Sequence, residues 1–109
     1  MQLMAAAYYP RKVGLGAPVA NFIAETPAQL GNLLRAARKA NRIRLEDLAQ
    51  LAGVSKQTVQ DIEHGKPTAQ LGKVLLLLRS LGVRVNLTVA PEQAAQVADV
   101  VARLGNEST

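Results

Sequence analysis

Residues 45–66, LEDLAQLAGVSKQTVQDIEHGK, constrain the fold of this chain more than any other stretch. Their apolar residues recur at the three- and four-residue spacing of helices, and Gly53 interrupts the pattern. Ser55 is a favoured residue at the start of a helix, because its hydroxyl accepts a hydrogen bond from a free backbone N–H. The stretch therefore predicts two short amphipathic helices, residues 45–52 and 56–64, joined by a tight turn.

The second of these helices has a polar face and an apolar face. On a helical wheel its polar side chains fill an arc from about 0° to 140°; they are Lys56, Gln60, Gln57 and Asp61. Val59 and Ile62 fall on the opposite side, at about 240–300°. An amphipathic helix of this size fits the major groove of DNA, where Gln and Lys side chains can bond purine edges. We therefore expect the polar face to read bases.

The composition agrees with a small helical protein that binds a polyanion. Thirteen Lys and Arg against eight Asp and Glu give a formal charge of +5, which suits a nucleic-acid partner. The chain is 49% hydrophobic but only 3% aromatic, so aliphatic side chains must build the core. Its 109 residues are enough for one compact domain with a terminal arm.

Several classes of protein are excluded or disfavoured. The chain has no cysteine, which excludes disulfides, thiol catalysis and Cys-based metal sites. It has no apolar run long enough for a membrane span, and its first residues lack the basic region of a signal peptide. We therefore expect a cytoplasmic, nucleoid-associated protein.

No arrangement of residues in the sequence predicts catalysis. His64 is the single histidine, and it lies about 13 Å from Ser55 along one helix, too far for proton exchange. Metal-ligand spacings and phosphate-binding glycine loops are absent from the sequence. We expect no enzyme activity, no metal site and no cofactor.

The remaining segments show where further helices begin and end. Residues 1–25 have no sustained periodicity and are interpreted as an arm, in which Tyr8 and Tyr9 pack loosely or stack on a partner. Thr26, Pro27 and Gln29 predict a helix start, with the helix running to about residue 41. Its expected buried stripe consists of Leu30, Leu33, Leu34 and Ala37.

A fourth helix is expected from Pro67-Thr68 to Gly82. Leucine and valine recur in it at helical spacing, which is typical of core positions; these residues are Leu71, Val74, Leu75, Leu78 and Leu81. After Pro91, residues 92–104 predict a last helix.

Between Gly82 and Pro91 the apolar period changes from 3.6 to 2. Apolar residues alternate with polar ones, which predicts a half-buried strand; its apolar residues are Val83, Val85, Leu87 and Val89. This strand needs a partner, which is either the N-terminal arm or the same strand of a second copy. We favour the second copy, because a two-fold dimer satisfies both strand edges with identical residues.

The spacing of turn, cap and core residues over about residues 28–82 resembles the Xre/Cro-type repressor helix-turn-helix. The residues that carry this resemblance are Arg38, Ile43-Arg44, Leu48-Ala49, Ala52-Gly53-Val54-Ser55, Val59, Ile62-Glu63 and Gly65-Lys66. The strand that follows makes the chain most similar to HipB-type antitoxins. The resemblance implies a homodimer that represses its own operon on double-stranded operator DNA and binds a HipA-like serine/threonine kinase toxin.

The same resemblance assigns roles to individual residues. Base-reading positions are Lys56, Gln57, Gln60 and Asp61. Phosphate-contacting positions are Arg44, Ser55, Thr58, Gly65 and Lys66. Arg38 and Glu63 match a structural salt bridge. Two departures affect how the domain seats on DNA: Arg44 and Leu45 replace the Thr or Asn cap and the Gln that family members usually carry at the start of the second helix.

The predicted fold is mostly α, a lambda-repressor-like helix-turn-helix domain of four to five helices with a C-terminal β-strand that pairs across a dimer. The domain covers residues 26–82, between the arm, 1–25, and the dimerisation strand with its C-terminal helix, 83–109. The predicted function is sequence-specific repression, as the antitoxin of a HipBA-like operon. The alternative is a stand-alone regulator of the same family, phage-type or metabolic, without a toxin partner.

Overall fold

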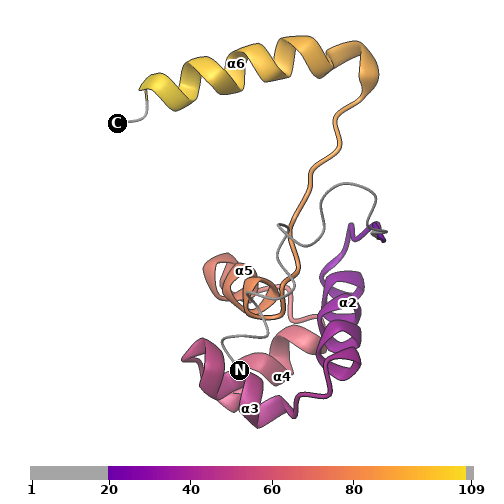
Figure 1. Cartoon of the computed structure of the whole chain (residues 1–109), viewed down its shortest axis with the longest axis vertical. Coiled ribbons are helices and arrows are strands. Elements are labelled where there is room, and N and C mark those ends of the chain that lie inside the picture. Colours follow the sequence, from indigo (N-terminus) through magenta and orange to yellow (C-terminus); the bar gives the residue numbers. More distant parts are fainter. Residues whose placement is uncertain (1–19, 108–109) are drawn as a thin grey trace.

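The structure is a computed structural model that describes residues 20–107. Its elements are α2 (Pro27–Ala40), α3 (Leu45–Ala52), α4 (Lys56–Glu63), α5 (Leu71–Ser80), the 3₁₀ turn η1 (Pro91–Gln93) and α6 (Ala94–Glu107). Helices α2 to α5 pack into one body, and α6 stands away from it at the end of an extended segment (Figure 1). None of the helices in the described part is both long enough and apolar enough to span a membrane.

The predicted start and end of the first helix are confirmed. The Thr26 hydroxyl accepts a hydrogen bond of 3.1 Å from the N–H of Gln29, and Pro27 occupies the first turn. The helix ends at Ala40, after which Arg42 adopts a left-handed backbone with a φ of 57°. This turn reverses the chain and brings Ile43 into the core.

The core of the body is aliphatic, because the chain has almost no aromatic residues to contribute. All four helices and the segments between them supply side chains that are nearly inaccessible to solvent. They are Leu34, Ile43, Leu48, Ala49, Val59, Ile62, Val74, Leu77, Leu78 and Leu81, with Leu30 and Ala37 packed against them.

Helices α2 and α4 approach each other closely at Gly31. A Cβ placed on Gly31 would collide with the backbone carbonyls of Ile62 and Glu63. Gly31 is therefore part of the packing of α2 on α4, which fixes the C-terminal end of α4 against the body.

The fourth predicted helix begins later than expected, at Leu71 instead of near Pro67. Residues 66–69 form a β-turn, in which the N–H of Ala69 bonds to the carbonyl of Lys66 at 3.3 Å, and α5 begins at Leu71. Proline suits the second position of a turn as well as the first turn of a helix, so Pro67 did not mark the helix start.

The leucine run of α5 is only half buried. Leu77 and Leu78 are 0% and 2% exposed, whereas Leu71 and Leu75, expected in the core, are 67% and 43% exposed. Four consecutive residues go once around a helix, and the body covers only one side of α5. Part of the run must therefore face away.

The predicted β-strand is wrong. Residues 83–90 are extended but form no strand, and none of the elements in the part of the chain that the structure describes is a strand. A strand requires a neighbouring strand for its hydrogen bonds, and residues 20–107 offer none. The alternating residues are mostly exposed, Leu87 at 88%. The predicted arm, with Tyr8 and Tyr9, lies largely outside the described residues.

Candidate nucleic-acid interface

A left-handed residue and a hydroxyl cap set the direction of α4. Gly53 ends α3 with a φ of 73°, a conformation that glycine adopts without steric cost. The N–H of Val54 then bonds back to the carbonyl of Ala49 at 3.0 Å, which closes the turn. Ser55 begins α4, since its hydroxyl accepts a 3.0 Å hydrogen bond from the N–H of Thr58. The two helices of the predicted motif are confirmed and packed together.

Packing decides which face of α4 meets the solvent. Val59 and Ile62 are buried in the core, so the opposite side of the helix faces outwards. Lys56 and Gln57 are exposed, and Gln60 and Asp61 are half-buried at the edges of this face. All four predicted base-reading residues therefore lie on one helix and are accessible to a ligand.

Asp61 connects the outer face of α4 to the turn that follows it. Gln57 donates a 2.8 Å hydrogen bond to one carboxylate oxygen of Asp61, and the Lys66 ammonium lies 3.5 Å from the other. The hydrogen bond from Gln57 and the positive charge of Lys66 lower the pKa of Asp61 below its ordinary value. The carboxylate thus offsets the charge of Lys66 and orients the Gln57 amide.

Arg44 is oriented by an acid of the following helix. It stands at the start of α3 without a side-chain cap and bonds to both carboxylate oxygens of Asp47, at 2.9 and 3.2 Å. This hydrogen-bonded pair lowers the pKa of Asp47 and raises the pKa of Arg44. The Arg44 side chain is 73% exposed, so a phosphate can reach it only in competition with Asp47.

The remaining predicted phosphate positions serve the turns that flank α4. The hydroxyls of Ser55 and Thr58 are 2.8 Å apart, at the N-terminus of α4. Gly65 has a φ of 82°, and a Cβ there would come within 2.8 Å of the Cα of Ala28. Gly65 is therefore required by the packing of the turn on α2, and it brings Lys66 to the surface.

Arg38 and Glu63 form a buried, bidentate salt bridge between α2 and α4. The two bonds measure 2.6 and 3.1 Å, and a third group of the guanidinium donates to the Ile43 carbonyl at 3.0 Å. Both residues are less than a tenth exposed, which places this arginine out of reach of DNA. The pair holds together α2, the α2–α3 turn and the end of α4.

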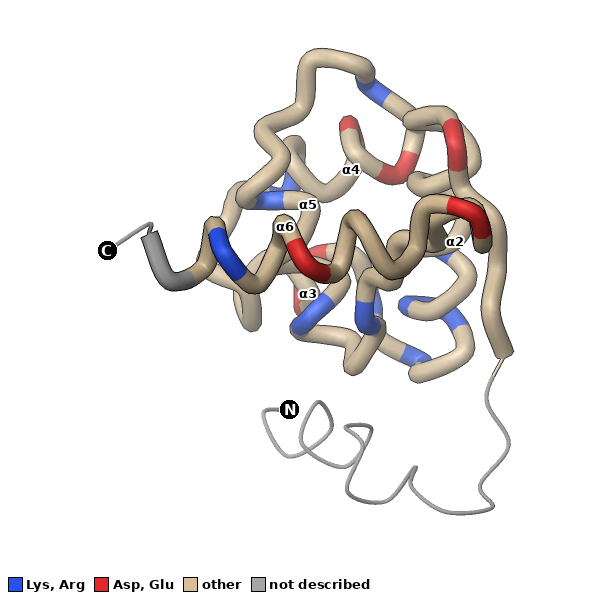
Figure 2. Tube along the Cα trace, turned by 90° about the horizontal axis from the view of Figure 1, so that it is seen from above, with Lys and Arg blue, Asp and Glu red and all other residues tan. Residues whose placement is uncertain are grey.

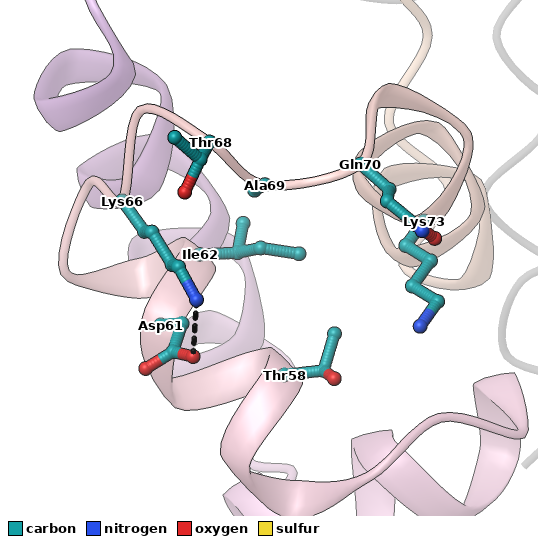
Figure 3. Close-up of a pocket in the computed structure, with 8 residues that line it drawn as sticks. All are labelled: Thr58, Asp61, Ile62, Lys66, Thr68, Ala69, Gln70 and Lys73. Atoms are coloured by element: carbon teal, nitrogen blue, oxygen red, sulfur yellow. Dashed lines mark hydrogen bonds and ion pairs between the residues drawn. The ribbon is translucent and has the colours of Figure 1, made fainter.

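Sequence analysis missed a groove between α4 and α5. It has a volume of about 270 Å³ and is lined by Thr58, Asp61, Ile62, Lys66, Thr68, Ala69, Gln70 and Lys73. Figure 3 shows Lys66 on one side and Lys73 on the other. A loop and the first turn of α5 supply Thr68, Gln70 and Lys73, so no periodic signal groups them. Polar side chains with two lysines form a surface suited to a phosphate.

Charge is unevenly spread over the molecule. Lys and Arg gather on α2 and on the turn that follows it, at Arg35, Arg38, Lys39, Arg42 and Arg44, whereas α3 carries the acidic Glu46 and Asp47 (Figure 2). Among the described residues, no group of acidic and histidine side chains is placed to hold a metal ion. The electrostatic features of the body thus favour an anionic polymer.

Comparison with known proteins agrees with this geometry. Residues 29–90 match a family described as "Helix-turn-helix domain". The uncharacterized HTH-type transcriptional regulator y4mF of Sinorhizobium fredii is 44% identical over 69 residues, which are 63% of this chain and 91% of that protein. Among solved structures, a HipB–O4 20mer complex aligns with a TM-score of 0.60 at 24% identity, covering 64% of this chain and 99% of that chain.

A second solved structure, a HipA–HipB–O2–O3 complex, aligns with a TM-score of 0.60 at 23% identity over 64% of this chain and 99% of that chain. At these identities the two likenesses concern the fold alone. The chain belongs to the Xre-type helix-turn-helix transcriptional regulators, and its fold is similar to that of HipB.

Proposed function

We propose that this regulator represses transcription by binding a two-fold symmetric operator as a homodimer. The observation that carries the proposal is the outer face of α4, which presents ammonium, amide and carboxylate groups on a helix whose other side is buried. Such a helix fits the major groove. Two copies related by a two-fold axis would place their α4 helices in successive grooves about 34 Å apart.

The residues divide between base reading and backbone contact. Lys56, Gln57, Gln60 and Asp61 are the proposed base readers, because amides and lysines discriminate base edges. Arg44, Ser55, Thr58, Gly65 and Lys66 are the proposed phosphate contacts, at helix starts and on the turn beside the groove. Lys73 is added to this second set, since it lines the same groove as Thr58 and Lys66.

Repression would follow from occupancy of the DNA, without a chemical step. The test is footprinting of the purified full chain on the DNA upstream of its own gene. We expect protection of an inverted repeat whose half-sites are one helical turn apart, about 10 base pairs. Protection of a single, unrepeated half-site at all concentrations would contradict the homodimer. It would still agree with base reading by α4.

We further propose that the regulator is the antitoxin of a HipBA-like operon, with a HipA-like kinase toxin as its partner. The proposal is supported by the likeness of the fold to HipB, including HipB in a complex with HipA. The alternative is a stand-alone regulator, as the name of the 44% identical relative also allows. Affinity purification of the chain from its native cells separates the two, because an antitoxin retains the kinase in stoichiometric amount and a stand-alone regulator does not.

A further inference from the structure

Helix α6 has no adequate surface to pack on within the described chain. Its Val100, Val101 and Leu104 are 42%, 60% and 56% exposed, and it packs to an appreciable extent only against η1. The radius of gyration is 15.8 Å, whereas about 13 Å is usual for a compact domain of 100 residues. Isolated helices of this length are marginal in water, so α6 needs a partner surface.

The apolar side of α6 is wide and regular. Ala94, Val97, Val101 and Leu104 follow one another at spacings of three, four and three residues, which forms a continuous seam on a helix. Gln96, Asp99 and Arg103 lie together on the opposite side, within about 60° of one another. The seam is therefore suited to pack against a second apolar helix, with the polar side left in water.

The chain carries a matching apolar surface on α5, the α5 patch, which consists of Leu71, Leu75 and Leu76. These leucines are 67%, 43% and 39% exposed. Gly72 lies among them, and a Cβ placed on it would meet no atom within 4 Å. A second helix can therefore approach α5 closely there. The α5 patch and the α6 seam are two exposed apolar surfaces on one small chain, a combination that marks an interaction site.

The charges around the two surfaces are complementary. Exposed Arg79 lies on α5 beside the patch, and exposed Glu92 lies in η1 at the start of α6. On the polar side of α6, Arg103 and Asp99 pair with each other at 3.5 Å. Contact between the start of α6 and the α5 surface would therefore bring an acidic residue to a basic one.

The connecting segment directs α6 away from the α5 helix of its own chain. Residues 83–90, VRVNLTVA, contain no glycine or proline and alternate β-branched or apolar residues with polar ones, which favours an extended backbone over a turn. Eight extended residues span about 26 Å. In the structure α6 stands away from the α5 helix of its own chain, and the α5 patch of that chain stays uncovered (Figure 1).

We propose that α6 of each copy packs across the α5 patch of a second copy, so that two chains exchange these helices reciprocally. A two-fold arrangement covers both apolar surfaces in both chains at once and closes the assembly at a dimer. The match to the helix-turn-helix family ends at residue 90, and α6 lies beyond it. The proposed exchange of α6 is therefore not part of the matched family domain. The proposal rests on the proposed homodimer but not on base reading.

The absence of cysteine from the sequence allows a direct test by cross-linking. One full-length copy carries Leu75→Cys and a larger tag, and the other carries Val101→Cys. After the two are mixed, diluted and reconcentrated under mild oxidation, we expect the mixed disulfide to dominate over both homodisulfides. Gln96→Cys replaces Val101→Cys as the matched control on the polar side of α6, and it should cross-link poorly.

Two results of this experiment would overturn the proposal. One is equal cross-linking by the polar-side control, and the other is the absence of the mixed disulfide. A chain that carries Leu75→Cys and Val101→Cys together provides a further check. If it forms only an internal disulfide, α6 folds back on its own α5, which also overturns the exchange.

Sedimentation of single variants gives an independent measurement. Val101→Asp places a charge in the seam and should weaken self-association at least about tenfold, while Gln96→Asp should leave it unchanged. The unfolding of the α2–α5 body should be the same in both variants. If Val101→Asp self-associates as strongly as wild type and still binds the operator, the role of α6 is overturned, whereas the proposed homodimer is not. A wild-type chain that stays monomeric on its operator would overturn both.

Discussion

The Nε2 atom of Gln57 donates a 2.8 Å hydrogen bond to the carboxylate of Asp61, one turn further along α4. Both side chains lie on the outer face of the helix, so the bond fixes the direction in which the amide presents its oxygen. One N–H and the carbonyl oxygen of Gln57 remain free to bind a ligand. A donor beside an acceptor is the combination that recognises an adenine edge in the major groove.

Replacement of Gln57 by alanine should reduce affinity for the cognate site by about 1–3 kcal/mol. The loss on random DNA should be smaller, because non-specific binding depends on phosphates and not on base edges. Fluorescence anisotropy with both duplexes measures the difference, and Gln96→Ala on α6 is the matched control. Equal weakening on both duplexes would show that Gln57 does not read a base.

Replacement of Lys66 by alanine should weaken binding to all sequences alike. Loss of one phosphate contact should also reduce the slope of log affinity against log salt by about one. The measurement is a salt titration with specific and random duplexes. Arg103→Ala removes a cation that is far from the proposed interface and should leave the slope unchanged. A loss confined to one base pair would contradict the phosphate assignment of Lys66.

Replacement of Arg38 by alanine should destabilise the fold by about 3–5 kcal/mol, because it leaves the Glu63 carboxylate buried without its partner. Urea unfolding at neutral pH measures the change. Arg44→Ala breaks an exposed ion pair instead and should cost no more than about 1 kcal/mol. Similar costs for the two variants would argue against the structural importance of the buried pair.

Gly31→Ala should destabilise the chain by about 1–3 kcal/mol, the usual cost of overpacking. The added methyl group would meet the carbonyls of Ile62 and Glu63 where α2 crosses α4. Asn32→Ala is the matched control on the exposed side of the same helix. Alanine is the better helix former, so this variant should stabilise the chain by up to about 0.7 kcal/mol. Thermal or urea unfolding separates the two, and stabilisation by Gly31→Ala would refute the close approach.

The pH dependence of stability should report the charge of Asp61. The hydrogen bond from Gln57 and the charge of Lys66 hold its folded-state pKa below the ordinary value of 3.8. Its favourable contribution is therefore complete above that value and is lost as the pH falls through the folded-state pKa. The difference in unfolding free energy between wild type and Asp61→Asn should shrink on acidification below about pH 4. A difference that does not change with pH would contradict the pairing.

Sequence was sufficient to predict the elements that have local signals. Thr26 and Ser55 mark helix starts through hydroxyl caps, and Gly53 marks the turn between α3 and α4, because each of these features depends on residues a few positions apart. The helical spacing of apolar and polar residues alone predicted which side of α4 faces outwards. The same reasoning misplaced the start of α5, since Pro67 fits a turn and a helix equally well.

The features that the sequence did not reveal depend on distant partners. Which leucines of α5 are buried is decided by the position of α3, and Leu75 and Leu77 are equivalent until that position is known. The groove joins Lys66 to Lys73 through a loop conformation that has no periodic signature. The strand expected at 83–89 required a neighbouring strand, and alternation of apolar residues specifies a preference for extended backbone without supplying that neighbour.

The most direct test of base reading by α4 is selection of bound sequences from a library of randomised duplexes, with wild type and Gln57→Ala compared in parallel. Base reading by α4 predicts that wild type enriches an inverted repeat and that Gln57→Ala loses preference at one symmetric pair of positions while keeping the rest of the motif. A motif unchanged by the substitution, or no enriched motif for wild type, would contradict it.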